Sequence, residues 1–346
     1  MKKYLSLLFA LFPLLAWAQF DTYFSKASLR VDYVLTGNHD ETTFSLKELI
    51  REPYWSGSQT NLIDTLEFGN YIVKVYESGT DKLLFSKGYQ NLYGEWTTTP
   101  EALSLTKSFE ESVIVPFPKV AIDIVLSYKD WENELKEGMR FTVRPDDYFI
   151  RDYDNLNLPV YDAWIGNKDF TKAVDIVILP EGYTQAEMGK FIKDCDFFVK
   201  SLFSYAPYDR YRESFNVRGV MAPSAESGCT MPGDHIYKNT VMRFSFWTFD
   251  SERYCMSTDN RDIRDLAGQV PYDQIYILVN TENMVVAAFT TSIVPARAAT
   301  AIRATSSSMS SATASLVSLM NTTTMKPVTT TCITSMWSRG SRISLP

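Results

Sequence analysis

Residues 174–205 constrain the fold of this chain more than any other segment. They begin with a short, mostly apolar run rich in β-branched residues (174–179), in which Asp175 is the only charge. Such a run predicts a buried strand. A turn, a helical pattern and a second strand at residues 215–221 follow. This order predicts an α/β layer in which a right-handed crossover joins parallel strands.

The turn after the first run carries a helix-start signal. Residues 180–183 interrupt the strand, and Thr184 and Glu187 then fit a capping box, which satisfies free amides of a first helical turn. We therefore expect an amphipathic helix, with Cys195 as a core residue on its apolar face. Its apolar positions recur at helical spacing, at Phe191, Cys195, Phe198 and Leu202.

Residues 1–18 have the character of a signal peptide. Lys2 and Lys3 precede an apolar run at residues 5–15, and the small residues around Trp17 fit cleavage after Ala18. The run is too short to span a bilayer, and we expect no later membrane span. The mature protein is therefore expected to be periplasmic or secreted.

Charge and cysteine usage exclude several classes of protein. The formal net charge of −7 argues against a nucleic-acid partner, which needs a basic face. The four cysteines show no C-x-x-C spacing, so a zinc knuckle or a redox pair is not expected. Outside the cytoplasm, Cys229 and Cys255 could form a disulfide, and the sequence leaves this open.

Residues 19–143 predict an antiparallel β-sandwich. Apolar residues alternate at period two in short runs that turn residues separate, as at residues 79–81, and no strong helical pattern interrupts them. We identify no catalytic constellation here, and His39 is interpreted as a turn residue rather than a ligand. The expected strands are residues 29–35, 71–76, 83–85, 113–118, 120–126 and 141–143.

A linker and a second domain are expected to follow. Residues 144–168 are acidic and contain proline, and we expect this linker to pack along the second domain at residues 169–284. That domain includes a polar loop at residues 222–259, in which Asp234 precedes His235. Zinc needs three or four ligands, and one histidine does not supply them. We therefore assign no catalytic, metal or cofactor-binding residue. A short helix at 262–270 and a strand at 272–280 complete the pattern.

The last segment, residues 285–346, has a different composition. It holds 12 Ser and 12 Thr but no Asp, Glu or Tyr, whereas all 41 acidic residues lie before it. One interpretation is a low-complexity secreted tail. The segment is not repetitive, and a second interpretation is that it is translated out of frame.

Four motifs resemble the IgA-peptidase family of secreted zinc metallopeptidases. The resemblance runs from about residue 20 to Thr281 and implies an N-terminal sandwich domain, the first half of a zincin-like (metzincin-like) catalytic domain, and a protein or peptide substrate. In that family the last strand leads to a helix with an H-E-x-x-H motif, whose histidines bind zinc and whose glutamate is the general base. The motifs are VDIVILPEGYT (174–184), IYKNT (236–240), SERY (251–254) and VPYDQIYILVN (270–280).

The genetic code relates the tail to this missing motif. When the last base of each codon is read with the first two of the next, residues 305–324 permit I-F-V-H-E-F-G-H-G-F-A-G-L-A-D-E-Y-Y. Residues 283–292 and 336–342 permit further family-like segments in the same frame. We therefore predict that residues 285–346 are out of frame, with the change near Glu282, and mostly disordered. The resemblance implies a zinc ion in intact members of the family. This chain is expected to lack the two histidine ligands and the catalytic glutamate of the H-E-x-x-H motif.

Two classes of function are consistent with these observations. The first is a secreted zinc metalloendopeptidase that is inactive as printed. The alternative is a non-enzymatic exported protein that binds glycan or protein through aromatic loops. An incomplete catalytic domain is also expected to leave apolar faces partly uncovered near Phe191, Phe198 and Ile277. The oligomeric state cannot be read from the sequence. Such aromatics more often pack in a core or a loop than contact a ligand. The aromatic candidates are Tyr89, Tyr93, Trp96, Phe244, Phe246 and Trp247.

Overall fold

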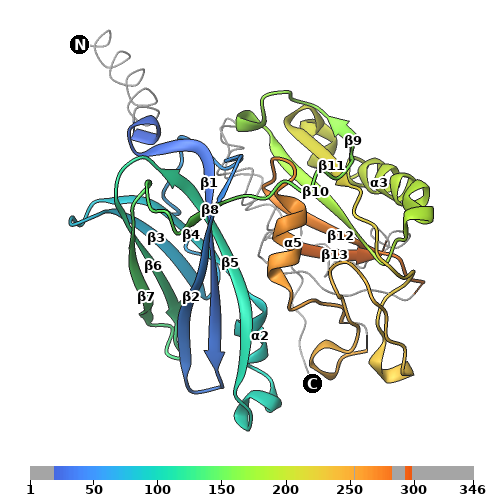
Figure 1. Cartoon of the computed structure of the whole chain (residues 1–346), viewed down its shortest axis with the longest axis horizontal. Helices are drawn as coiled ribbons and strands as arrows, with labels where there is room; N and C mark the ends of the chain where they lie inside the picture. The colour runs from blue at the N-terminus through green and yellow to red at the C-terminus, as the bar shows by residue number, and fades with distance from the viewer. Residues whose placement is uncertain (1–18, 253, 283–292, 298–346) are drawn as a thin grey trace, which may run out of the picture.

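A computed structural model of the chain describes residues 19–252, 254–282 and 293–297. Within these ranges the chain forms two four-stranded sheets and one five-stranded sheet, with few helices. Figure 1 shows the two four-stranded sheets on one side and the third sheet with its helices on the other. The predicted signal peptide and most of the predicted tail lie outside the described residues.

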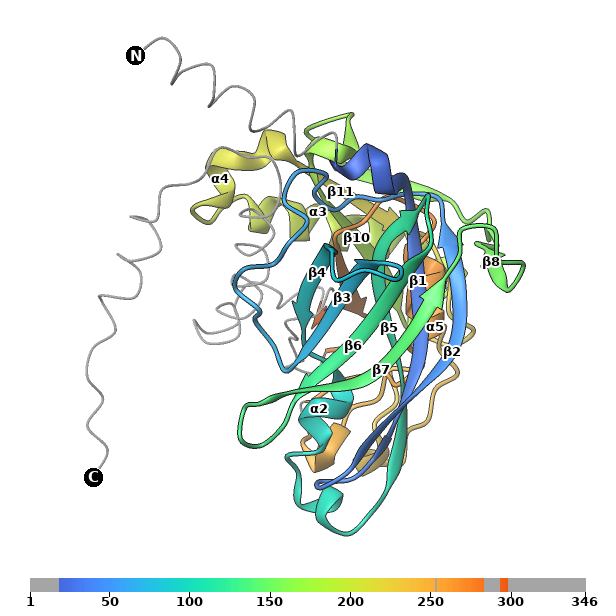
Figure 2. The same cartoon turned by 90° about the vertical axis from the view of Figure 1, so that its left-hand side faces the viewer.

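The two four-stranded sheets form a β-sandwich over one apolar core. Their strand orders are β5-β1-β2-β8 and β4-β3-β6-β7, and Figure 2 looks onto this side of the molecule. All neighbouring strands are antiparallel except β2 and β8, which pair in parallel. The strands are β1 (Phe24–Gly37), β2 (Thr42–Glu52), β3 (Tyr71–Glu77), β4 (Leu83–Tyr89), β5 (Lys107–Pro118), β6 (Ile122–Lys129), β7 (Leu135–Val143) and β8 (Ile150–Asp152).

Period-two alternation predicts most of this sandwich correctly. Leu29, Val31 and Tyr33 of β1 share the core with Val73 and Val75 of β3. Strands β1 and β3 belong to different sheets of the sandwich. Each predicted strand overlaps an observed one. Strand β2 and the short helix α2 (Leu92–Trp96) were not predicted. Strand β2 has mainly polar or half-exposed residues through its middle, so it lacks the alternation that identifies a strand.

The third sheet is mostly parallel and lies in the second half of the chain. Its order is β13-β12-β10-β11-β9, and only β9 runs antiparallel to its neighbour. The predicted strand–helix–strand order is therefore confirmed as a parallel pair, β10 and β11. The elements are β9 (Val160–Ile165), β10 (Val174–Glu181), α3 (Met188–Leu202), α4 (Tyr208–Tyr211), β11 (Phe215–Val220), α5 (Asn260–Ala267), β12 (Gln274–Val279) and β13 (Ile293–Arg297).

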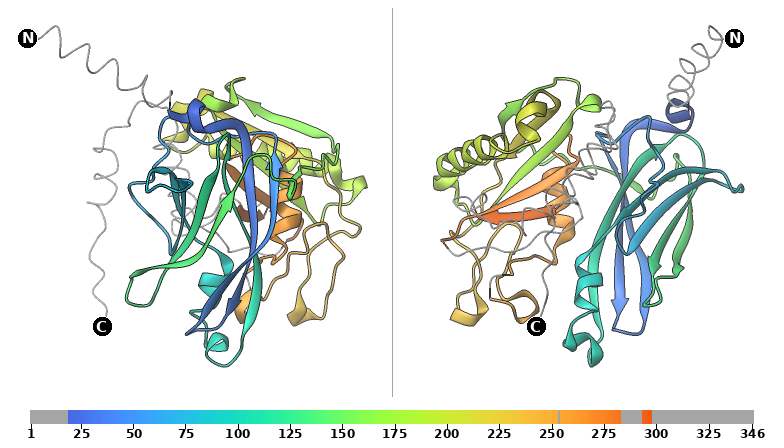
Figure 3. Two further views of the ribbon diagram at one scale, coloured as in Figure 1. Left: turned by 60° about the vertical axis from the view of Figure 1, so that its left-hand side comes forward. Right: turned by 180° about the vertical axis from the view of Figure 1, so that it is seen from behind.

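Helices cover both faces of the third sheet, which explains the continuous apolar run in β10. Ile176 and Ile178 belong to the core that includes α3, whereas Val177 and Leu179 belong to the core that includes α5. Figure 3 shows α5 on the face toward the sandwich and α3 on the outer face. None of the helices in the described ranges has the length and apolar character of a membrane span.

The start of α3 confirms the predicted capping box. The Thr184 amide donates to the Glu187 carboxylate at 2.9 Å, and the Thr184 hydroxyl bonds the same oxygen at 2.9 Å. Residues 185–187 form a 3₁₀ turn, and the α-helix begins at Met188. Cys195 is fully buried on the helix face turned toward the sheet, as predicted.

One expectation about the second domain is corrected by the structure. Phe191, Phe198 and Ile277 are buried, so the apolar faces near them are covered. The tail was predicted to be mostly disordered, and within it Ile293–Arg297 forms strand β13, parallel to β12 at the edge of the sheet. The rest of the predicted disordered tail lies outside the described residues.

The segment predicted as a linker contributes strands to both halves of the molecule. Strand β8 adds to the sandwich by pairing with β2, and β9 pairs with β11 at the edge of the third sheet. Tyr153 lies between these strands, and its hydroxyl donates to the Asp265 carbonyl at 2.5 Å. The segment therefore packs against the second domain and also bonds to both sheets.

A buried arginine joins the sandwich to the second domain. The Arg30 side chain of β1 is fully buried, and its Nη2 donates to the Asp265 carboxylate of α5 at 2.6 Å. Its Nη1 donates to Glu52 at 3.2 Å, and its Nε lies 3.1 Å from Asp32. Burial disfavours the charge, but the three carboxylates outweigh that effect and raise the pKa of Arg30. Arg30 therefore fixes α5 against the sandwich.

Candidate functional site

The carboxyl ends of β10 and β12 meet at one edge of the third sheet. Open parallel sheets bind ligands at this edge. Strand β10 ends at Glu181, and Asn280 follows β12. From here the chain leaves its last core strand toward the segment in which the H-E-x-x-H helix is expected. That segment lies outside the described residues, so the described part of the edge consists of the strand ends and the loop at 222–259.

Glu181 is a fully buried carboxylate at the end of β10. Its two oxygens accept the amide hydrogens of Met242 at 3.2 Å and Phe244 at 3.0 Å. Burial raises the pKa of Glu181 to about 7, although these hydrogen bonds oppose the rise. Glu181 therefore holds the 222–259 loop against the sheet and changes charge near neutral pH.

Asn280 and Glu187 fix the end of β12 to the start of the α3 segment. The Asn280 amide nitrogen donates to the Gly182 carbonyl at 2.9 Å and to Glu187 at 3.1 Å. The Ser227 hydroxyl also donates to Glu187, at 2.9 Å. Burial alone would raise the pKa of Glu187, but hydrogen bonds from Thr184, Ser227 and Asn280 lower it to about 2. This carboxylate is held ionised by structural bonds, which makes it a poor general base.

The two histidines of the chain do not build a metal site with the described residues. His39 lies in the bend between β1 and β2, as predicted, and stacks on Trp131 with ring centroids 4.5 Å apart. His235 is exposed, with a φ of 57°, after a 3₁₀ turn that contains Asp234. Within the described ranges, no three His, Cys, Asp or Glu side chains gather as a metal-binding group. The described residues alone therefore do not supply the three or four ligands that a zinc site needs.

Cys229 and Cys255 come together inside the 222–259 loop. Their Sγ atoms lie 3.6 Å apart, both side chains are buried, and each is a free thiol. The pairing that the sequence left open is therefore sterically accessible. Cys332 lies outside the described residues.

The aromatic residues named for ligand contact in the alternative function are mostly core residues, the role expected more often for such side chains. Five of the six are at most 8% exposed, and only Trp247 is substantially exposed, at 36%. Sequence alone did not separate loop aromatics that face solvent from those that fill the core beneath a loop. The five buried aromatics are Tyr89, Tyr93, Trp96, Phe244 and Phe246.

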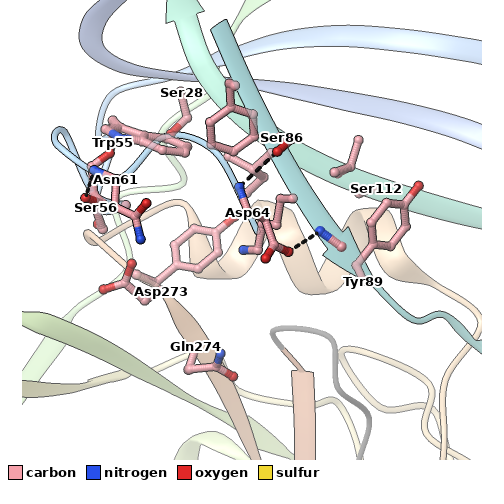
Figure 4. Close-up of a pocket in the computed structure, with 18 of the residues that line it drawn as sticks. Ser28, Trp55, Ser56, Asn61, Asp64, Ser86, Tyr89, Ser112, Asp273 and Gln274 are labelled. Atoms are coloured by element: carbon pink, nitrogen blue, oxygen red, sulfur yellow. Dashed lines mark hydrogen bonds between the residues drawn. The ribbon is translucent and has the colours of Figure 1, made fainter. Parts of the chain in front are cut away.

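A recess of about 180 Å³, lined by both apolar and polar side chains, lies between the sandwich and the second domain. Figure 4 shows Asp64 beside Ser86 on one side, with Asp273 and Gln274 of the second domain facing them. The Asp64 carboxylate accepts the Gly88 amide at 2.9 Å. The Ser56 hydroxyl and the Gln274 carbonyl oxygen are buried without a partner among the described residues. Such groups suit ordered water or a small polar molecule.

Sequence reasoning missed this recess for a topological reason. Its walls come mainly from β4, β5, the loop at 54–66, α5 and the start of β12, which are far apart in the sequence. Gln274 begins β12, so the recess lies at the amino ends of the parallel strands, opposite the edge that Glu181 and Asn280 form. The described residues that line the recess include no cysteine nucleophile and no histidine ligand.

Two family models match this chain. Residues 19–140 match the model described as Peptidase M64 N-terminus, and residues 165–302 match the model described as IgA Peptidase M64. The second match continues beyond Met284 into the segment predicted to be out of frame. A search of curated proteins found no match. Together the two matches cover most of the sandwich and of the third sheet, and the edge at which β10 and β12 end.

Proposed function

Because this chain belongs to the IgA peptidase M64 family, we propose that it derives from a secreted, zinc-dependent endopeptidase that acts on protein substrates. The sandwich is the family's N-terminal domain, and the third sheet with its helices is the front half of a zincin-like (metzincin-like) catalytic domain. The chain as printed does not hydrolyse peptide bonds, and residues 285–346 are the product of a shifted reading frame.

One observation carries this proposal. After the last residue of β12, Val279, the rest of the chain contains a single acidic residue, Glu282, and no histidine. A hydrolytic zinc site needs several imidazole or carboxylate ligands and a carboxylate that acts as general base. The codons of the expected first histidine straddle Ser308 and Met309, and those of the second straddle Ala312 and Thr313. None of these four side chains is a good zinc ligand or a general base.

The described carboxylates at the sheet edge do not replace the missing motif. Glu181 is fully buried and bonded to two loop amides, and Glu187 is bonded to Thr184, Ser227 and Asn280. A general base must reach the attacking water with a free lone pair. Both side chains instead hold the edge from which the catalytic helix would continue. This supports the proposal that the chain keeps the family's scaffold but lacks its general base.

The proposal is tested by restoring the reading frame. We expect the printed chain to leave casein and immunoglobulin uncut, whereas a chain restored near Glu282, which carries H-E-F-G-H, cuts at least one of them in a chelator-sensitive manner. The matched control is the restored chain with the glutamate of that motif changed to glutamine. Cleavage by the printed chain, or a restored chain that binds zinc but cuts nothing, contradicts the proposal.

Export is a second part of the proposal. Residues 1–18 combine lysines, an apolar run and a small-residue cleavage site, and we expect export to leave Gln19 as the first residue. Intact mass and N-terminal sequencing of the exported protein measure this. A mature chain that still begins at Met1 contradicts it.

The alternative of an exported glycan- or protein-binding protein loses its main support. The aromatic residues that suggested it are buried, except for Trp247. The recess between the domains remains compatible with a small ligand, but its described carboxylates Asp64, Asp273 and Glu52 are bonded to the protein itself.

A further inference from the structure

We infer that Cys229 and Cys255 are an oxidative modification site, at which a disulfide closes the 222–259 loop. The two thiols lie 3.6 Å apart, and both side chains are buried, at 3% and 0% exposure. They are separated by 26 positions in the sequence, so a bond between them would close most of the loop. The inference rests on the proposed export for its oxidising environment.

Backbone hydrogen bonds hold the two cysteines at this distance. The residues that follow them, Thr230 and Met256, both pair with Ser245 on a central segment of the loop. The Ser245 and Met256 amides exchange hydrogen bonds with each other's carbonyls at 2.9 and 3.1 Å, and the Phe246 amide donates to the Thr230 carbonyl at 3.0 Å. The main chain on both sides of the central segment therefore sets the separation, rather than the side chains alone.

The thiols face each other within an apolar cluster that offers few other partners. Cys229 and Cys255 belong to the core that includes α5, Met242 and Phe244. The Cys229 thiol donates to the Phe244 carbonyl at 3.2 Å. A disulfide has an S–S distance of about 2.05 Å, so the two sulfur atoms must approach by about 1.5 Å. Rotation of the two side chains supplies a movement of that size.

The chemistry is a thiol–disulfide exchange with an oxidised dithiol protein or a small disulfide. One thiolate attacks the donor disulfide, forms a mixed disulfide and releases a donor thiolate. The protein's second thiolate then attacks the sulfur of the protein's first cysteine within that mixed disulfide and releases the other donor thiolate. The two protons pass to the donor thiolates, so the donor gains two electrons and the protein loses them. Burial raises the pKa of Cys255, so we expect exchange while the loop is still open during folding.

The bond would act on a part of the chain that has little regular secondary structure. The described part of the 222–259 loop has only isolated bridges and short 3₁₀ turns, yet Met242 and Phe244 within it bond the buried Glu181. Closing the loop covalently reduces the freedom of the unfolded chain. The edge of the sheet beside β10 would therefore gain stability from the bond.

The experiment compares the wild-type chain, C229S, C255S and the double variant. The exported protein is denatured in the presence of an alkylating agent, and we expect Cys229 and Cys255 to resist alkylation. Before alkylation, the mass of the exported protein should lie about 2 Da below that of the reduced chain. Cys195 should be alkylated and serves as the internal control. A reductant should lower the wild-type Tm by about 5 to 10 °C and leave the double variant unchanged.

A second arm separates this inference from the proposed export. Reduced chain made in the cytoplasm is refolded with oxidised glutathione, and the same two cysteines should become linked. Linkage there with no export overturns the proposed localisation and leaves the site standing. Alkylation of both cysteines in the refolded chain, or in correctly exported chain, overturns the inference.

Discussion

Glu181 shows how one residue couples the charge of this protein to its folding. Its carboxylate is buried at the end of β10 and accepts two amides of the 222–259 loop. Burial raises the pKa of Glu181 from 4.5 to about 7. Because the folded protein holds this proton more tightly than the unfolded chain, the contribution to stability is full below pH 4.5 and is lost as the pH rises through 7.

Replacing this carboxyl group should remove the pH dependence that it causes. We expect Glu181→Gln to gain about 3 kcal/mol of stability relative to the wild type between pH 4.5 and pH 8, because glutamine does not ionise. Urea unfolding at both pH values measures the change, with the exposed Glu213→Gln as the control. A difference between Glu181→Gln and wild type that stays constant with pH would show that Glu181 ionises freely in the folded state.

Residue-level predictions succeeded where local sequence carries the signal. The capping pair Thr184 and Glu187 and the core position of Cys195 are predictable from spacing alone, and both are confirmed. Burial of Phe244 and the proton affinity of Glu181 depend on packing between distant segments. Sequence periodicity contains no information about such packing, so which of the loop aromatics are buried could not be read from the sequence.

At the scale of elements, the α3 start is held by a single carboxylate. Glu187 bonds Thr184 within its own turn and also Ser227 and Asn280 from two other segments. The end of β12, the loop and the helix start therefore share one anchor. The capping box identifies where the helix begins, but the two bonds to distant segments become visible only in the folded chain.

Removing the Glu187 carboxylate should lower the free energy of unfolding more than removing the side chain of Gln185 in the same turn. We expect Glu187→Ala to lower the free energy of unfolding by about 1 to 2 kcal/mol at pH 7, and the exposed Gln185→Ala to change it by less than about 0.5 kcal/mol. Folding lowers the pKa of Glu187 to about 2. Its contribution is therefore present above pH 4.5 and is lost as the pH falls toward 2.

Denaturant unfolding at pH 7 and pH 2.5 checks this expectation. The gap between wild type and Glu187→Ala should narrow at the lower pH. Equal effects of the two alanine substitutions would show that the helix start does not depend on the carboxylate.

Elements were predictable to different degrees for physical reasons. The buried strands β10, β11 and β12 have runs of apolar residues that only a covered sheet accommodates, and each lies where expected. Strands β8 and β9 are short and half-exposed, and they form because longer strands offer them a free edge. An edge of this kind is a tertiary feature, so the sequence indicated only a linker.

At the scale of the molecule, charge joins the two halves. Arg30 is buried between Asp32 and Glu52 of the sandwich and Asp265 of α5. Asn260 of α5 also donates to Glu111 of β5, at 3.0 Å. A buried cation with carboxylates from both domains is costly to disrupt on one side only, because its partners are then left buried and unpaired.

Removing this cation should destabilise the whole chain. We expect Arg30→Met to lower the free energy of unfolding by about 3 to 5 kcal/mol. The sandwich and the second domain should then unfold in separate transitions. The exposed pair of Arg140 and Glu137 provides the control, since Arg140→Met should cost at most about 1 kcal/mol. Calorimetry measures both effects. An Arg30→Met cost no larger than that of Arg140→Met contradicts this role.

The segment beyond β12 decides whether the whole molecule can be an enzyme. The two-domain architecture could be predicted because each half has its own periodicity, whereas the contacts between the halves could not. The loss of the catalytic chemistry remains a prediction from composition, since acidic residues and histidines are absent after Glu282. The chain has only two histidines, and among its described residues neither belongs to a metal-binding group.

The most direct test is the zinc content of the purified chain, measured by elemental mass spectrometry after dialysis against excess zinc and then against buffer. We expect far less than one zinc per chain for the printed sequence and about one per chain once the H-E-F-G-H segment is restored. Stoichiometric zinc in the printed chain would contradict the central claim that this chain lacks its catalytic metal site.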